Sequence, residues 1–227
     1  HHLRGHIASN YLCHPELEPP FLCLVASGGH SHIVSVDSYV DLRVLARTRD
    51  DAAGEAFDKA ARAMGIPYPG GVELDKIAEE GDPNAYKLPR PRLDQGGLDF
   101  SFSGLKTAAL NILHNAAQRG EQVCVKDLCA SYRQAVVGYL ADHFRRAAEE
   151  TGAKRLAAAG GVSANRLLRR ELTAYGAQRR MPVYLPSPQL CGDNAAMIAA
   201  QGYYEYMAGV RAGTDLNAYA QREISLG

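Results

Sequence analysis

The chain has 227 residues, of which 46% are hydrophobic and 22% are charged. This composition is typical of an ordinary globular protein and argues against disorder. Lys+Arg and Asp+Glu each number 25, so the formal net charge of zero excludes a strongly basic chain that binds nucleic acid through bulk charge alone.

No apolar run approaches the roughly 18 residues that a membrane span needs, so we expect no membrane association. The five cysteines form an odd set without a CxxC pair. This pattern argues against a disulfide framework or a four-cysteine zinc site and favours a reducing, cytoplasmic location.

The first half of the chain predicts a helix over 1–14 and then three short strands joined by tight connections. These strands are expected to form an antiparallel unit at 21–26, 32–36 and 42–46. Two further helices are predicted over 50–64 and 72–80, and Glu55 with Lys59 forms an i,i+4 pair on the first of them.

The second half follows a long loop over 81–100, which is rich in Gly, Pro and charged residues. Helices are predicted over 103–117 and 127–150. Strands at 156–159 and 183–185 then alternate with helices at 163–175 and 193–207, a pattern typical of parallel strands in an α/β fold. The loop suggests a division into residues 1–100 and residues 101–227.

Histidines at i and i+4 near the start of the chain could bind one metal ion. His2 and His6 fall on one face of the predicted helix, and Asp193 is a candidate third ligand from a distant segment. The alternatives are a solvated helix face for the histidines, a tag remnant for His2 and a helix N-cap for Asp193. Leu3 occupies the place of the general base in a zincin peptidase, which argues against that chemistry.

Two glycine pairs follow predicted strands and could bring backbone N–H groups to an anion. The first lies in Ser27-Gly28-Gly29, and the second is Gly160-Gly161, with Asn165 five residues after Gly160. Asn165 could donate a hydrogen bond to a ribose or a base. An ordinary hairpin and a tight strand–helix turn are the alternatives.

Acidic residues suited to sugar hydroxyls occur between these pairs. Asp58 lies in a predicted helix, and Asp75 follows the Gly70-Gly71 pair. Solvated helix carboxylates are the alternative. Ser103 is a candidate helix cap, and Lys106 is a candidate phosphate ligand.

Seven segments in this order resemble the tRNA N6-adenosine threonylcarbamoyltransferase (TsaD) family, in its bacterial form. Any one segment alone is weak evidence, but seven in order with compatible spacing are highly specific. They are His2 to His6, Val25 to His30, Asp50 to Lys59, Tyr68 to Gly71, Asp99 to Thr107, Gly160 to Asn165 and Cys191 to Ala196.

The resemblance implies an α/β fold of the actin/sugar-kinase/Hsp70-like type, with two lobes and a nucleotide between them. It also implies transfer of a threonylcarbamoyl group from threonylcarbamoyl-AMP to N6 of adenosine 37 in tRNAs that read ANN codons. The family pattern assigns His2, His6 and Asp193 to one divalent metal ion, Fe²⁺ or Zn²⁺. It assigns the adenylate, or ATP or AMP, to Val25, Ala26, Ser27, Gly28, Gly29, Asp58, Gly71, Asp75 and Asn165.

The resemblance further implies tRNA, a TsaB-like paralogue and a TsaE-like ATPase as partners. It indicates that the family's N-terminal segment is absent before His1, which would leave the N-terminal lobe incomplete and this chain alone inactive. No general base is identifiable. The alternatives are a metallopeptidase, a non-catalytic nucleotide-binding scaffold and a small-molecule carbamoyltransferase. A local basic stretch of Lys87, Arg90, Arg92 and Lys106 could contact tRNA, or it could simply be a solvated loop.

Overall fold

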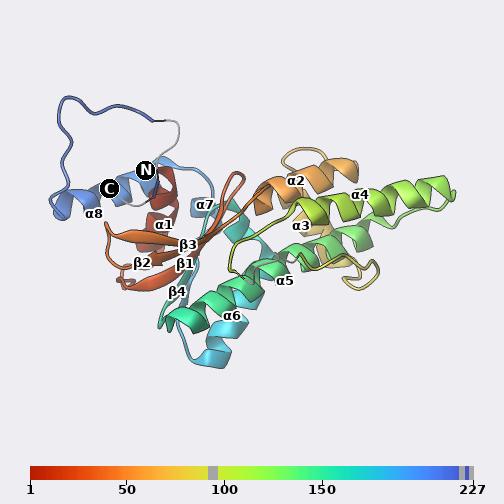
Figure 1. Cartoon of the computed structure of the whole chain (residues 1–227), viewed down its shortest axis with the longest axis horizontal. Coiled ribbons are helices and arrows are strands. Elements are labelled where there is room, and N and C mark those ends of the chain that lie inside the picture. The colour runs from red at the N-terminus through yellow and green to blue at the C-terminus, as the bar shows by residue number, and fades with distance from the viewer. Residues whose placement is uncertain (92–96, 220–222, 225–227) are drawn as a thin grey trace.

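The computed structural model of the chain describes residues 1–91, 97–219 and 223–224 (Figure 1). The elements of its first half are α1 (His2–Cys13), β1 (Phe21–Ala26), β2 (Ser31–Val36), β3 (Leu42–Arg47), α2 (Ala53–Ala63), α3 (Gly70–Ile77) and the 3₁₀ helix η1 (Ala78–Glu80). Those of the second half are α4 (Ser103–Gln118), α5 (Val125–Thr151), β4 (Leu156–Ala159), the 3₁₀ helix η2 (Gly161–Ala164), α6 (Arg166–Arg179), β5 (Val183–Tyr184), α7 (Pro188–Cys191) and α8 (Ala195–Met207).

One five-stranded sheet, in the order β3-β2-β1-β4-β5, unites the strands of both halves. The predicted antiparallel unit is confirmed, because β1 pairs with β2 and β2 pairs with β3 in that sense. The predicted parallel strands are confirmed as well, since β4 runs parallel to both β1 and β5. The suggested division near residue 100 stays a prediction.

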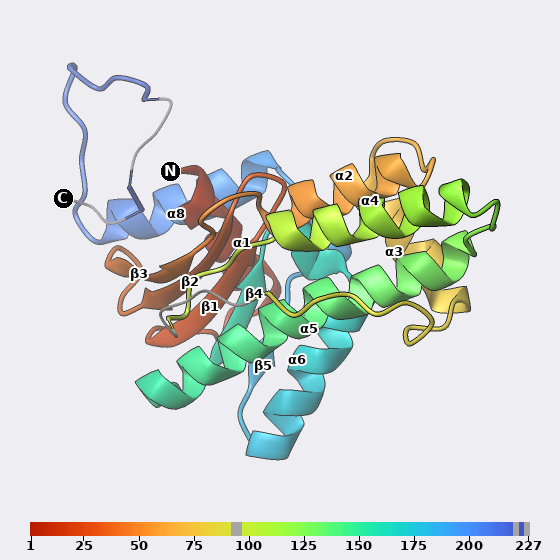
Figure 2. The ribbon, with the colours of Figure 1, turned by 45° about the vertical axis from the view of Figure 1, so that its right-hand side comes forward.

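The central strand β1 is buried on both faces, because helices cover the sheet from two sides. Side chains alternate between the faces of a strand. Cys23 and Val25 therefore belong to the cluster under α1, whereas Leu22 and Leu24 belong to the larger cluster with the remaining helices. Figure 2 shows α1 and α8 behind the sheet and α5 and α6 in front of it.

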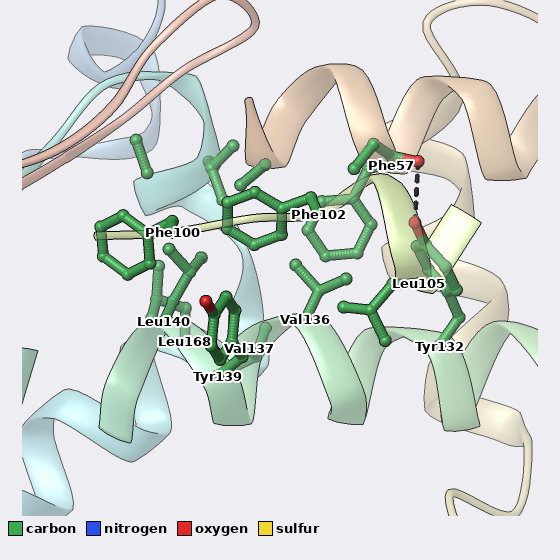
Figure 3. Packing of buried hydrophobic residues seen from close by; sticks show 14 of the residues in the cluster. Phe57, Phe100, Phe102, Leu105, Tyr132, Val136, Val137, Tyr139, Leu140 and Leu168 are labelled. Carbon is green, nitrogen blue, oxygen red and sulfur yellow. Dashed lines mark hydrogen bonds between the residues drawn. The ribbon is translucent and has the colours of Figure 1, made fainter. Parts of the chain in front are cut away.

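The larger cluster continues from the sheet into a block formed by α2, α3, α4 and α5. Phe100 and Phe102 stack with a centroid distance of 5.9 Å and meet Tyr139 of α5 edge-on (Figure 3). Tyr132 donates a hydrogen bond of 3.1 Å to the carbonyl oxygen of Ala56, so its hydroxyl group is satisfied within the apolar cluster.

The entry into α4 differs from the expected cap. Ser103 was predicted as a helix cap, but the N-cap position is Phe102 and no side chain caps it. The carboxylate of Asp50 instead accepts hydrogen bonds from the Phe102 N–H (2.8 Å) and the Ser103 hydroxyl (2.7 Å). The predicted cap was wrong because the carboxylate of Asp50, which is distant in sequence, occupies the positive N-terminal end of α4.

The turn after β4 approaches β1 so closely that it excludes a side chain. Gly160 has φ +88° and ψ 164°, a region that only glycine adopts readily. A Cβ atom there would lie 2.3 Å from the carbonyl oxygen of Ala26. Neighbouring Gly161 has open space around the corresponding position.

An ionic network joins η1 to α5 and α6. Glu79 accepts two hydrogen bonds from Arg170 (3.1 and 3.2 Å) and also contacts the guanidinium group of Arg133. These bonds from Arg170 and Arg133 lower the pKa of Glu79 to about 2. The Glu79 side chain is 29% exposed, so solvent screens part of this interaction.

We expect Gly160→Ala to destabilise the chain by about 2 kcal/mol or more, through backbone strain and the clash with Ala26. Gly161→Ala should change the free energy of unfolding by less than about 0.5 kcal/mol, since it meets neither constraint. Denaturant unfolding of the two variants measures the difference. Equal stabilities would contradict the close approach of β4 and β1.

We expect Glu79→Gln to lower the free energy of unfolding by about 1–2 kcal/mol at pH 7, after allowance for solvent screening. Because the folded-state pKa lies below the unfolded-state value, the stabilisation is complete above about pH 4.5 and is lost as the pH falls toward 2. Unfolding curves at pH 7 and pH 3 should therefore show a smaller difference between variant and wild type at pH 3. Glu150→Gln, which changes an exposed glutamate of α5, is the matched control, and a pH-independent difference would refute the assignment.

Candidate metal and nucleotide site

The histidines of α1 and the aspartate before α8 meet as one group of three. Asp193 Oδ1 lies 3.4 Å from His2 Nε2 and 3.1 Å from His6 Nε2. All three ligand atoms lie within 4.8 Å of one another. Two imidazoles and one carboxylate form a donor set that suits Fe²⁺ or Zn²⁺ with coordination positions left open.

The polar atoms of His6 indicate that this group is built for a ligand. His6 is 1% exposed; its Nε2 faces Asp193 Oδ1 at 3.1 Å, and its buried Nδ1 makes no hydrogen bond with a described residue. Burial lowers its pKa, and the neighbouring His2 lowers it further, against the opposing effect of Asp193. Its imidazole is therefore neutral at neutral pH, which is the form that coordinates a metal ion.

Close packing of α1 on α8 brings the three ligands together. A Cβ atom on Gly5 would lie 2.7 Å from Ile198 Cδ1, so glycine between the two histidines lets the helices approach (Figure 1). Asn194, rather than Asp193, caps α8 by accepting a hydrogen bond from the Met197 N–H. The N-cap alternative for Asp193 was therefore wrong, and its carboxylate, 74% exposed, remains available to the histidines.

The Ser27-Gly28-Gly29 turn joins β1 to β2 beside the start of α2. Ser27 is buried and held from two directions, because its N–H donates to the His30 carbonyl (2.8 Å) and its carbonyl accepts from the Gly54 N–H (3.1 Å). Gly28 and Gly29 are exposed. A Cβ atom on Gly54 would lie 2.6 Å from the Ser27 carbonyl oxygen, so only glycine fits at this contact. The fold therefore fixes the base of the turn and leaves the amides at its tip open.

Asp58 and Gly71 form a second part of the expected nucleotide site. The Gly71 N–H donates a hydrogen bond of 2.8 Å to Asp58 Oδ1. The carboxylate thus sits at the N-terminus of α3, where the helix dipole favours negative charge. Asp58 is half-buried, and its assignment to the nucleotide stays a prediction.

Asp75 and Asn165 form a third part and contact each other directly. Asn165 Nδ2 donates to Asp75 Oδ1 at 2.9 Å, and Arg133 donates to the same oxygen at 3.0 Å. Asp75 Oδ2 accepts from the Arg166 N–H at 3.2 Å. Asn165 also caps α6 by accepting a hydrogen bond from the Leu168 N–H. Both side chains are buried, so the solvated alternative was wrong for Asp75.

The three parts differ in how the sequence reveals them. Val25 and Ala26 end β1 beside Ala159 and Gly160, so the two glycine turns lie next to each other at the carboxyl ends of β1 and β4. Sequence reasoning missed Gly54 and Arg133. Gly54 could have been noticed because a glycine within a predicted helix indicates a close backbone contact. Arg133 was harder to notice, since the only indication is a charged residue among apolar positions of α5.

The described members of the predicted basic stretch lie on two different segments. Lys87 and Arg90 are exposed on the loop before residue 92, and Lys106 is half-buried on α4. Arg92 lies outside the described residues. Among the helices that the structure describes, none combines the length and apolar character that crossing a membrane requires.

Comparisons with known proteins agree with the geometry. A family model described as tRNA N6-adenosine threonylcarbamoyltransferase (TsaD) matches residues 1–200. Curated relatives of that name from Clostridium kluyveri and Moorella thermoacetica are 47% and 49% identical over 218 residues, which cover 96% of this chain and 64% of each relative. A relative from Clostridium beijerinckii is 45% identical over 226 residues, or 66% of its length. The chain thus spans about 64% of the length of the first two relatives.

Solved structures share the fold at low sequence identity. Full-length HypF, in a form described as phosphate- and nucleotide-bound, aligns with a TM-score of 0.66 and 16% identity, over 95% of this chain and 36% of HypF. HypF from T. kodakarensis aligns with a TM-score of 0.59 over 92% of this chain and 37% of its own. The expected α/β fold is confirmed, and these alignments show that HypF shares it. With a family model that matches most of its length, the chain belongs to the tRNA N6-adenosine threonylcarbamoyltransferase family.

Proposed function

We propose that the complete protein containing this chain transfers the threonylcarbamoyl group of threonylcarbamoyl-AMP to N6 of adenosine 37 in tRNAs that read ANN codons. The observation that carries the proposal is the joining of His2, His6 and Asp193 into one donor group in a chain of this family. The glycine turn at 27–29 lies nearby, because His30 at the end of that turn interacts electrostatically with both histidines.

His2, His6 and Asp193 would hold one divalent metal ion, Fe²⁺ or Zn²⁺. Such an ion supplies Lewis-acid polarisation and orientation of substrate oxygens. The buried His6 forms the floor of the site, while His2 and Asp193 are open to solvent on its outer side. This arrangement leaves room for a substrate group beside the ligands.

The adenylate is assigned to the three parts that surround the carboxyl ends of β1 and β4. Ligands of open α/β sheets bind at this end of the strands. The exposed amides of Gly28 and Gly29 suit a phosphate, and Asp58 suits ribose hydroxyls. Asp75 and Asn165 hold each other in fixed positions beside α6. The nucleotide- and phosphate-bound form of HypF supports a nucleotide site on this fold.

The chemistry needs one bond formed and one broken. The N6 amine of adenosine attacks the carbamoyl carbonyl carbon, the bond from that carbon to the phosphate oxygen breaks, and AMP leaves. The attacking nitrogen loses one proton. Amides of the 27–29 turn are suited to stabilise the negative charge on the leaving phosphate.

Partners and location follow from the family. We infer that tRNA is the second substrate, that a TsaB-like paralogue and a TsaE-like ATPase assist in bacteria, and that the protein acts in the cytoplasm. A metallopeptidase is disfavoured because Leu3 replaces the general base that a zincin carries after its first histidine. A non-catalytic scaffold is disfavoured because it has no need of an assembled donor group.

We expect Asp193→Asn in the full-length protein to lower metal affinity by more than about 100-fold, since changes outside the ligand sphere alone cost 10- to 100-fold. Product formation from threonylcarbamoyl-AMP and unmodified tRNA should fall in parallel, as measured by mass spectrometry of digested tRNA. Asp142→Asn, which changes an exposed aspartate of α5, is the matched control. Full activity of a metal-free Asp193→Asn protein would refute the metal assignment, and a metal-loaded wild type without product would refute the transferase.

We expect Asp58→Asn to weaken AMP binding about tenfold, because a neutral amide is a poorer acceptor for ribose hydroxyls than a carboxylate. The amide oxygen can still accept the hydrogen bond of Gly71, so the unfolding midpoint should change little. Titration calorimetry with AMP and with 2′,3′-dideoxy-AMP tests the contact. An unchanged preference of the variant for the ribose form would exclude Asp58 as a sugar ligand.

A further inference from the structure

A groove adjoins the metal group, and its wall also includes residues of the segment after α8, Leu216 and Ile224 among them. Its volume is about 1210 Å³, and its wall includes the metal-site residue His2 together with His30, His32, Arg47 and Asp99. Such a volume exceeds that of most small-molecule sites. None of the residues assigned to the adenylate lines this groove, so it offers space for a second substrate.

The antiparallel register places the groove side chains in one row. His32 of β2 lies opposite Arg47 of β3 and opposite Val25 of β1, so all three point to the face that carries α1. His30 and His32 stack with a centroid distance of 5.6 Å and an interplanar angle of 28°. The row therefore runs from His2 through two parallel imidazoles to a guanidinium group.

His32 has a ring nitrogen that is still available to bind a ligand. His32 Nδ1 is buried and makes no hydrogen bond with a described residue. Burial, together with His30 and Arg47, lowers the pKa of His32 to about 4 against the opposing effect of Asp99. Its ring is thus neutral at neutral pH, with one donor and one acceptor nitrogen. Stacked neutral imidazoles suit a nucleobase.

Arg47 differs from the two other arginines of this segment. Arg43 pairs with Asp37 at 3.8 Å, and Arg49 pairs with Asp99. Among the residues that the structure describes, the Arg47 guanidinium has no ion-pair partner, and the residue is exposed. An unpaired guanidinium at the end of the row suits a phosphate of a polynucleotide backbone.

We propose that this groove binds the acceptor nucleotide of the RNA substrate, with His30 and His32 against its base and Arg47 on an adjacent phosphate. The inference rests on the proposed function, because it supplies the acceptor side of that transfer. Because His2 belongs to both the groove wall and the metal group, a base bound in the groove would present its exocyclic amine beside the metal group. The neutral net charge of the chain is consistent with recognition through one unpaired guanidinium rather than through bulk charge.

The test uses the full-length protein with an unmodified anticodon stem-loop RNA that carries the acceptor adenosine. We expect Arg47→Ala to weaken RNA binding about tenfold and to reduce the salt dependence by about one ion. Affinity for AMP and metal content should stay at wild-type values. Lys154→Ala, which removes an exposed cation before the amino end of β4, is the charge-matched control and should have no such effect.

Two further variants separate the roles of charge and ring. Arg47→Lys should retain most of the binding, because it preserves the charge. His32→Phe preserves a stacking surface but removes the nitrogens, so the KM for RNA should rise about tenfold while the KM for the adenylate stays constant.

The proposal fails if Arg47→Ala and His32→Phe bind RNA as tightly as the wild type, or if Lys154→Ala weakens binding equally. It also fails if Arg47→Ala weakens AMP binding instead, since the guanidinium would then serve the adenylate. If the wild type binds RNA in a way that depends on Arg47 but forms no product, the groove proposal stands and the proposed transferase function is refuted. The failure of one proposal can therefore be told from the failure of the other.

Discussion

The parallel pairing of β1 with β4 is the constraint on which the rest of the site depends. It places Val25 beside Ala159 and therefore aligns the carboxyl ends of two strands that lie 134 positions apart in the chain. Beyond those ends the backbone of one turn lies in close contact with the backbone of its neighbour, so the contact positions require glycine. Gly160 clears the carbonyl of Ala26, and Gly54 clears the carbonyl of Ser27. Backbone amides thereby approach a ligand without intervening side chains.

The face of these strands that carries α1 supports the metal group. Cys23 and Val25 form part of the floor on which α1 packs, and α8 then covers α1. Because Gly5 permits close approach of the two helices, the His2–His6 face of α1 meets the residue just before α8. The sheet thus positions two kinds of chemistry: amide groups for an anion at the carboxyl ends of β1 and β4, and a donor group for a cation on the helix α1 that packs on one face.

Local sequence patterns predicted most of the fold, because each element has its own periodicity and its own breakers. The antiparallel unit, the parallel strands of the last third, the two glycine turns and the i,i+4 histidines were all predicted in this way, whereas the pairing of β1 with β4 was not. The four-residue helix α7 was not, since it is shorter than any periodic pattern. The cap expected at Ser103 was wrong because capping preferences describe the residue next to a helix, whereas Asp50 reaches α4 from 52 positions away in the sequence. At α8 the cap is Asn194, so Asp193, which was predicted as a metal ligand, faces the histidines instead.

The hydrogen-bond partners of the site residues could likewise not be predicted from the sequence. These partners decide which groups of the predicted residues remain available to a ligand. Asp75 was expected to meet a sugar, yet its carboxylate already accepts from Arg133, Asn165 and the Arg166 N–H. A carboxylate offers about four acceptor positions, so about one remains for a ligand. The Asn165 amide group retains one N–H, since its other donor reaches Asp75 and its oxygen caps α6. A substrate would therefore meet one free acceptor and one free donor in fixed directions. The buried ionic network around Arg133 orders this pair before any ligand arrives, so little side-chain entropy remains to be lost on binding.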